Sequence, residues 1–156
     1  MDKASLAEAL KAHRVWFDSL GHEGTQAVFN GKDLSGADFS EALLVEAQFQ
    51  GALLCGANFA GADLRGANFQ DANLEGALFF DSNLEEADLM WSVAKKARWK
   101  GAKFNGTYLQ GADLREAADL QYEQLAKAML DEDTHLPADI LIDDLKREDP
   151  PDPITS

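Results

Sequence analysis

The chain has 156 residues, enough for one domain with its own core, and carries a formal net charge of −14 at pH 7. No apolar run approaches the roughly 18 residues of a membrane-spanning helix, and the N-terminal residues lack the pattern of a secretion signal. The single cysteine, Cys55, excludes an internal disulfide and is typical of a reducing compartment, so a cytoplasmic location is expected.

Residues 1–24 are predicted to form a capping helix and a connector. Ser5 and Glu8 have the spacing of a capping box, and apolar side chains then recur at intervals of three and four as far as Leu20. His13 belongs to this apolar stripe and is interpreted as a packed side chain rather than a ligand. The helix is expected to cover the first unit of the repeat that follows, because the ends of a stacked repeat expose apolar side chains and unpaired backbone.

Residues 25–117 contain a repeat of five residues, with eighteen pentads running from Ala27 to Glu116 without a break in frame. Such a period fits neither an amphipathic helix nor a strand, and it indicates stacked units that share one core. The third residue of a pentad, its centre, is Leu or Phe in sixteen pentads; the first is Ala in fourteen and the fifth is Gly in ten. We expect the first and third residues to point inward, with the fifth at a corner where φ can be positive.

Along the first twelve pentads the centres alternate between Phe and Leu. Four pentads per coil would stack Phe on Phe and Leu on Leu, whereas three would mix them in every column, so a four-sided coil is predicted. Eighteen pentads then make about 4.5 coils, separated by about 4.8 Å. The centres expected to be large and inward are Phe29, Leu34, Phe39, Leu44, Phe49, Leu54, Phe59, Leu64, Phe69, Leu74, Phe79, Leu84, Leu89, Trp99, Phe104, Leu109 and Leu114.

The pattern loosens between Met90 and Lys103, where Ala94 and Trp99 occupy two successive centres. The small and the large side chain are expected to compensate each other in volume. The same stretch holds a cluster of five bases, which is interpreted as a solvated face. The alternative is a contact patch for an acidic partner or for nucleic acid. Direct nucleic-acid binding is not expected, because it usually needs exposed stacking aromatics beside the charge. These bases are Lys95, Lys96, Arg98, Lys100 and Lys103.

Two outward apolar residues, Leu78 and Phe80, flank one centre and should protrude from the same wall. In a four-sided coil they lie one turn below Arg98 and Lys100. We interpret these four residues as the candidate interaction patch, for a protein partner or for a second copy of the chain. The protein is accordingly expected to be a monomer or a weak homodimer.

The frame fails at Asp119, which falls where a large apolar centre is needed. Residues 118–136 are predicted to form a second capping helix, with Tyr122 and Leu125 on its apolar stripe. Residues 137–156 are predicted to be an acidic, proline-containing and weakly ordered tail.

The pentads resemble the pentapeptide-repeat family, whose signature is A(D/N)LXX. The resemblance covers about 90 of the 156 residues and implies a right-handed quadrilateral β-helix. Together with the two predicted capping helices, it gives the expected fold class, an all-β solenoid. It also makes the segment from Tyr122 to Pro137 look like a usual terminator of such a solenoid. The pentads that carry the resemblance are ADLRG at 62–66, ANLEG at 72–76 and ADLRE at 112–116, together with ANFQD at 67–71, which has Phe in place of the central Leu.

The sequence contains no Gly-rich phosphate loop, no nucleophile motif and no His or Cys cluster with metal-ligand spacing. The inward positions are filled by Leu, Phe and Ala, which leaves no interior cavity for a substrate. We therefore expect no enzyme activity, no cofactor and no metal. The favoured function is a non-catalytic interaction or scaffold module that presents the outer walls of a β-helix to a protein partner.

The family resemblance also implies an alternative function. Some members resemble B-form DNA in size and charge, bind DNA gyrase and protect it from quinolone-type inhibitors. The overall charge of this chain has the required sign, but the repeat contributes only −5, and residues 117–156 contribute −8. DNA gyrase is therefore the alternative partner of the sequence-based interpretation, as a target of DNA mimicry.

Overall fold

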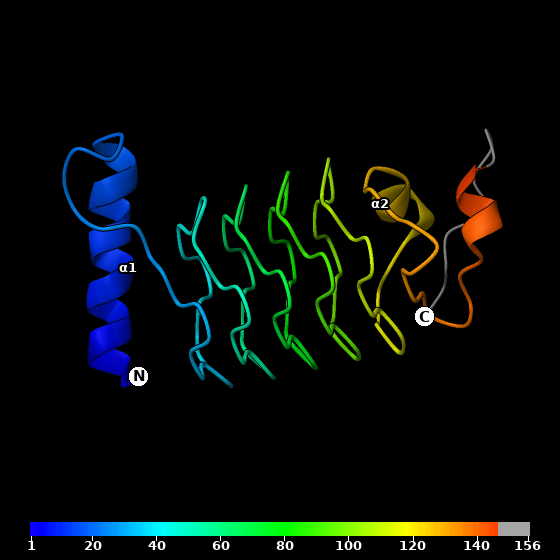
Figure 1. Cartoon of the computed structure of the whole chain (residues 1–156), viewed down its shortest axis with the longest axis horizontal. Coiled ribbons are helices and arrows are strands. Elements are labelled where there is room, and N and C mark those ends of the chain that lie inside the picture. Colours follow the sequence, from blue (N-terminus) through cyan, green and yellow to red (C-terminus); the bar gives the residue numbers. More distant parts are fainter. Residues whose placement is uncertain (147–156) are drawn as a thin grey trace.

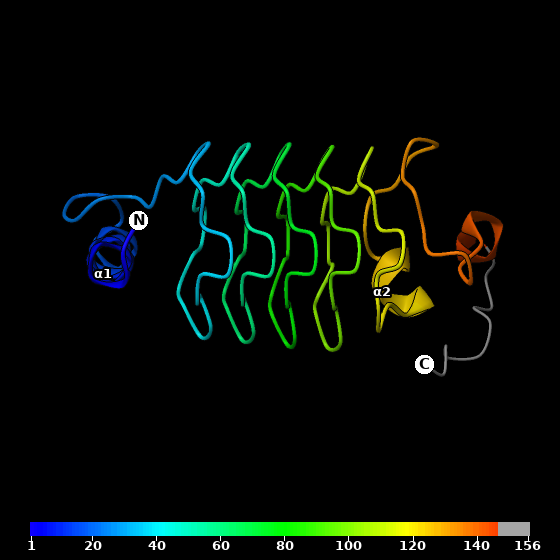
Figure 2. The same cartoon turned by 90° about the horizontal axis from the view of Figure 1, so that it is seen from below.

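The computed structural model describes residues 1–146 as a short rod with a helix at each end (Figure 1). The described helices are α1 (Lys3–Asp18), α2 (Tyr122–Ala126) and the 3₁₀-helix η1 (Ile142–Lys146). Between α1 and α2, the backbone winds into coils of similar outline that stack along the rod in two perpendicular views (Figures 1 and 2). The part of the predicted tail from residue 147 to residue 156 lies outside the described residues.

Parallel backbone bridges join each coil to the next at a constant separation of twenty residues. The series starts with Val28 and Gln48 and continues to Arg98 and Ala118. The Phe29 N–H donates to the Gln48 carbonyl at 2.7 Å, and the Gln48 N–H donates to the Ala27 carbonyl at 2.9 Å. Twenty residues are four pentads, so each coil has four sides, and the bridges stay short because the chain turns a corner in every pentad.

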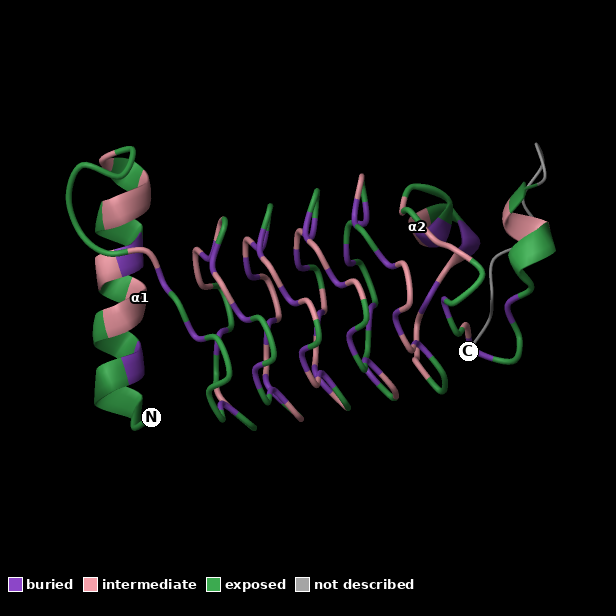
Figure 3. Ribbon diagram, in the orientation of Figure 1, coloured by how far each residue is buried: buried purple, intermediate pink, exposed green. Residues whose placement is uncertain are grey.

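The interior of the rod is filled by the third residues of the pentads and by most of the first residues, with the exposed Lys32 in the first coil as an exception to the expected pattern. All seventeen large centres from Phe29 to Leu114 are at most 4% exposed, and Figure 3 shows buried positions recurring along every coil. Aromatic rings stack coil upon coil, with Phe39 and Phe59 separated by 4.9 Å between ring centroids at an interplanar angle of 3°. Trp99 continues this column on Phe79, at 4.3 Å and 5°.

Every corner of the rod places a residue in the left-handed region of backbone space. The fifth residue of each pentad between Gly31 and Glu116 has φ between 54° and 75°. An L side chain in this conformation costs roughly 1–2 kcal/mol, which glycine avoids. The corner residues that nevertheless carry a side chain are Glu41, Glu46, Asp71, Asp81, Glu86, Trp91, Lys96 and Glu116.

Helix α1 covers the N-terminal end of the rod, although it begins two residues before the predicted capping box. The Asp2 carboxylate is its N-cap and accepts a hydrogen bond from the Ser5 N–H at 2.7 Å. Leu6 and His13 are its buried residues. The Nδ1 atom of His13 accepts a hydrogen bond from the Ala27 N–H at 2.9 Å, which ties the helix to the first coil.

The C-terminal end differs from the predicted capping helix over residues 118–136. Helix α2 has only five residues, and the chain then rejoins the ladder, with Met129 bridged to Tyr108 and His135 bridged to Asp113. These separations are 21 and 22 residues, so short insertions shift the register of the last turn. The side chains that cover the apolar end are Leu120, Tyr122 and Leu125.

Candidate interaction walls

The structure places the predicted patch on one wall of the rod, the Leu78 wall, formed by the outward residues of pentads 37–41, 57–61, 77–81 and 97–101. Leu78 is bridged to Arg98 one coil above, and both Leu78 and Phe80 are half-buried. The Arg98 guanidinium lies over the Phe80 ring at 5.1 Å from its centroid, and its Nη2 is 3.5 Å from Asp119 Oδ2. The four residues are therefore neighbours, but Arg98 already covers the apolar side chain below it.

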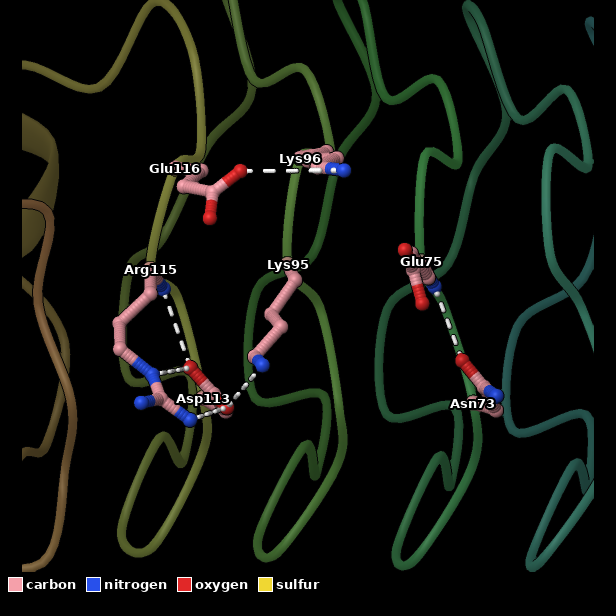
Figure 4. Close-up of polar contacts among 7 residues, drawn as sticks. All are labelled: Asn73, Glu75, Lys95, Lys96, Asp113, Arg115 and Glu116. Atoms are coloured by element: carbon pink, nitrogen blue, oxygen red, sulfur yellow. Dashed lines mark hydrogen bonds and ion pairs between the residues drawn. The ribbon is translucent and has the colours of Figure 1, made fainter.

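The five bases of the loosened stretch are spread over three successive walls, so they do not form one basic patch. Lys95 Nζ lies 3.9 Å from Asp113 Oδ2, and Lys96 Nζ lies 3.8 Å from Glu116 Oε2 (Figure 4). Arg115 donates to Asp113 through Nε at 2.9 Å and Nη2 at 2.7 Å. The hydrogen bonds from the Arg115 side chain lower the pKa of Asp113. These acids, one coil above the bases, balance much of the basic charge.

Most short polar residues that precede a centre accept a hydrogen bond from a backbone N–H of their own pentad, two residues further along the chain. In Figure 4, the Asn73 Oδ1 accepts a hydrogen bond from the Glu75 N–H at 3.1 Å. The equivalent contact from Ser35 lowers the pKa of Asp33. No group of three potential metal ligands occurs within residues 1–146. These carboxylates and amides therefore stabilise the backbone of the solenoid.

A different wall carries exposed apolar residues that lie outside the predicted patch. Trp91, Tyr108 and Met129 are 53%, 36% and 47% exposed. Tyr108 is bridged to Met129, and the Trp91 N–H donates to the Gln110 carbonyl one coil above, at 3.0 Å. With the half-buried Met90, these residues form what we call the Trp91 surface: Met90, Trp91, Tyr108 and Met129. The four-pentad period alone puts Met90, Trp91 and Tyr108 on one wall, whereas Met129 reaches it only through the shifted register of the last turn, which the repeat does not predict.

The grooves in the described part of the chain are open to solvent. One groove lies between the last turn and η1 and is lined by Leu136, Ile140 and Leu141 together with polar residues. No helix within residues 1–146 is long and apolar enough to cross a bilayer.

Comparison with known proteins identifies the repeat. The family model for pentapeptide repeats matches residues 42–79 and 82–117, in eight copies. The solved structure of alr5209, a pentapeptide repeat protein from Nostoc PCC 7120, is 21% identical, covers 86% of this chain and 89% of its own, and superposes with a TM-score of 0.59. This similarity shows the shared fold and implies a right-handed quadrilateral β-helix. Comparison with curated protein sequences gives no significant match.

Two further solved structures are similar at lower TM-scores. Rfr23, a pentapeptide repeat protein from the cyanobacterium Cyanothece 51142, is 22% identical over 74% of this chain and 68% of its own, with a TM-score of 0.47. Full-length QnrB1, a plasmid-mediated fluoroquinolone resistance protein, is 17% identical over 72% of this chain and 70% of its own, with a TM-score of 0.27.

Proposed function

Because the chain belongs to the pentapeptide-repeat family, we propose that it is a non-catalytic protein-binding module that uses the outer walls of a capped β-helix of about 4.5 coils. The observation that carries this proposal is the filled interior, since the large centres from Phe29 to Leu114 are at most 4% exposed. Small-molecule sites usually need a concave pocket with a few convergent polar groups. A rod packed with Phe, Leu and Ala leaves recognition to its exterior.

The ends of the rod are proposed to be closed by their helices rather than used for binding. At the N-terminal end, α1 places Leu6 and His13 against the first coil. At the other end, Tyr122 and Leu125 of α2 are buried. Capping removes the open strand edges that would otherwise favour end-to-end association. This supports binding through the walls.

The Leu78 wall is the first surface to test. The change Leu78→Glu with Phe80→Glu places two carboxylates around buried Phe79. The control pair, Leu53→Glu with Cys55→Glu, does the same around buried Leu54, on a wall that carries neither the Leu78 patch nor the Trp91 surface. Capture of partners from a lysate of the native host should be lost with the first pair and retained with the control pair. Equal capture by both pairs, with unchanged circular dichroism, would exclude this wall as the binding surface.

DNA gyrase is retained as a second candidate partner because of the net charge of −14. A DNA-mimic function predicts that micromolar protein inhibits supercoiling by purified gyrase or protects the enzyme from a quinolone. The bases on the rod, including Arg98 on the Leu78 wall, oppose uniform mimicry of a polyanion. If supercoiling and quinolone sensitivity are both unaffected, this candidate is excluded and the general protein-binding proposal is retained.

A further inference from the structure

We propose that the Trp91 surface binds a basic protein segment, with an arginine or lysine side chain on the Trp91 indole and a neighbouring apolar side chain against Tyr108 and Met129. This inference rests on the proposed function and adds to it a wall and a partner chemistry. Three observations support it: the backbone conformation of Trp91, the charge of its wall and the position of the chain's own bases.

Trp91 is the only apolar residue among the eight corner positions that carry a side chain. Its φ of 60° is one that L residues rarely adopt, and glycine would avoid the cost. The indole packs against Gly111 one coil above, where an added Cβ would lie 2.5 Å from the ring atom Cδ2. Even so, about half of the side chain remains exposed. A large aromatic residue in a strained and exposed position suggests a binding role.

The wall around Trp91 is strongly acidic. Together with its two corners it comprises residues 28–31, 46–51, 66–71, 86–91, 106–111 and 127–132. This surface holds six acids against one base, Lys127, whereas the Leu78 wall with its corners holds five acids against three bases. The six acids are Glu46, Asp71, Glu86, Asp88, Asp131 and Glu132.

Two of these carboxylates lie on either side of Trp91 along the rod. Asp71 occupies the same corner one coil below, and its N–H donates to the Met90 carbonyl at 3.2 Å. The Asp131 carboxylate belongs to the coil above Gly111, two coils above Trp91, and accepts a hydrogen bond from the Gly111 N–H at 3.0 Å. A cation placed on an indole between carboxylates gains both cation–π and ion-pair interactions. This arrangement complements an arginine or a lysine.

Three of the chain's bases near this end of the rod make contacts away from Trp91. Arg98 makes the cation–π contact described within residues 1–146, and its ring is Phe80 rather than Trp91. Around the corner from Trp91, Lys95 and Lys96 pair with the acids of the coil above, at 3.9 Å and 3.8 Å. Within residues 1–146 the cation–π contact found lies on Phe80, so we infer that the cation for Trp91 is supplied by another molecule.

The test uses a seven-residue peptide of alternating arginine and leucine as the probe, and the same peptide with glutamate in place of arginine as its control. Nuclear magnetic resonance of the full, ¹⁵N-labelled chain provides three indole N–H signals, from Trp16, Trp91 and Trp99. Trp99 is enclosed in the core and Trp16 lies on α1, at the opposite end of the rod. The arginine–leucine peptide should shift the Trp91 signal and leave the other two unchanged, and 0.5 M salt should weaken its binding.

Glycine variants separate binding from folding, because glycine suits the left-handed corners. Trp91→Gly should weaken peptide binding at least tenfold, and Asp71→Gly about threefold. The matched control is Lys96→Gly at the next corner, where φ is 59°, and it should bind as the wild type does. Thermal unfolding establishes that all three variants are folded at the temperature of the titration.

Several results would overturn the inference. They are an unmoved Trp91 signal at millimolar peptide, equal binding of the glutamate peptide, or equal binding by Trp91→Gly and Lys96→Gly. A Trp91 shift that grows with protein concentration and resists competition by peptide would make this surface a self-association face instead. If the lysate partner depends on Leu78 and Phe80 but not on Trp91, the proposed function survives and this inference fails.

Discussion

Replacing Gly111 with alanine should destabilise the rod by about 3 kcal/mol, roughly three times the cost of the same change at Gly56. At Gly56, φ is +67° and an added Cβ would meet nothing within 4 Å, so only backbone strain acts. That strain costs roughly 1–2 kcal/mol, and the lower entropy of the unfolded alanine chain returns about 0.4–1 kcal/mol. The net cost at Gly56 is therefore about 1 kcal/mol.

At Gly111 the same backbone strain is joined by a collision, because an added Cβ would lie 2.5 and 2.6 Å from two indole carbons of Trp91. The indole has to leave its packing position on the corner. It is 53% exposed there, so moving it returns on the order of 100 Å² of apolar surface to water. At about 20 cal/mol per Å², the lower end of the range for apolar burial, this adds roughly 2 kcal/mol to the cost of the substitution.

Urea unfolding followed by far-UV circular dichroism measures both costs, provided that the denaturant slope stays constant. In a Trp91→Gly background there is no ring to displace, so Gly111→Ala should cost only about 1 kcal/mol, as Gly56→Ala does. The double-mutant cycle should thus give a coupling of roughly 2 kcal/mol between the two positions. Equal costs of Gly111→Ala and Gly56→Ala in the wild type, or no coupling to Trp91, would refute the packing described for this corner.

Three further predictions concern the core and the N-terminal cap. Leu64→Ala should lower the free energy of unfolding by about 2–5 kcal/mol because Leu64 is fully buried. Gln50→Ala, at an exposed outward position, should lower it by less than about 0.5 kcal/mol. Similar urea midpoints for the two variants would contradict the inward and outward assignment. Trp99→Phe should change the unfolding free energy by less than about 1 kcal/mol, because the lost volume is offset by removal of a buried indole N–H that has no hydrogen-bond partner; a loss as large as that of Leu64→Ala would disprove this offset. Burial lowers the pKa of His13 below 6.5, so the folded state favours the neutral ring. The stability that this ring contributes is fully present above pH 6.5 and is lost as the pH falls through the lowered pKa. In His13→Asn the amide oxygen can accept from the Ala27 N–H without titrating, so the melting temperature should fall less between pH 7.5 and pH 5 than in the wild type, and equal falls would contradict this.

The regular part of the rod could be predicted from the sequence because its rule is one-dimensional. A large residue stands at every fifth position, and Phe alternates with Leu. Few coil sizes therefore stack Phe on Phe and Leu on Leu. In the structure, Phe49 lies 4.8 Å from Phe69, with parallel rings. The prediction needed no knowledge of distant contacts beyond a constant offset of twenty residues.

The C-terminal end could not be predicted in the same way because two patterns compete there. Tyr122, Leu125 and Met129 recur at helical spacing, yet only Tyr122–Ala126 is helical. Met129 instead bridges Tyr108, so its side chain faces outward and is 47% exposed. After Ala126 the backbone pairs with the coil below instead of continuing the helix that the apolar spacing predicts. Nothing in the local sequence indicates this pairing.

The corner columns add an argument about recognition. In five of the eight corner positions that carry a side chain, the residue one coil above is glycine, which leaves room for that side chain, as with Trp91 and Gly111. Where two side chains follow each other, they need to be compatible: Lys96 lies 3.8 Å from Glu116, and the opposite charges balance. Asp71 below Trp91 is a different pair, a carboxylate followed by an aromatic ring. Neither member neutralises the other, but both are groups that a cation contacts favourably. This pairing favours a basic partner over an acidic or a purely apolar one.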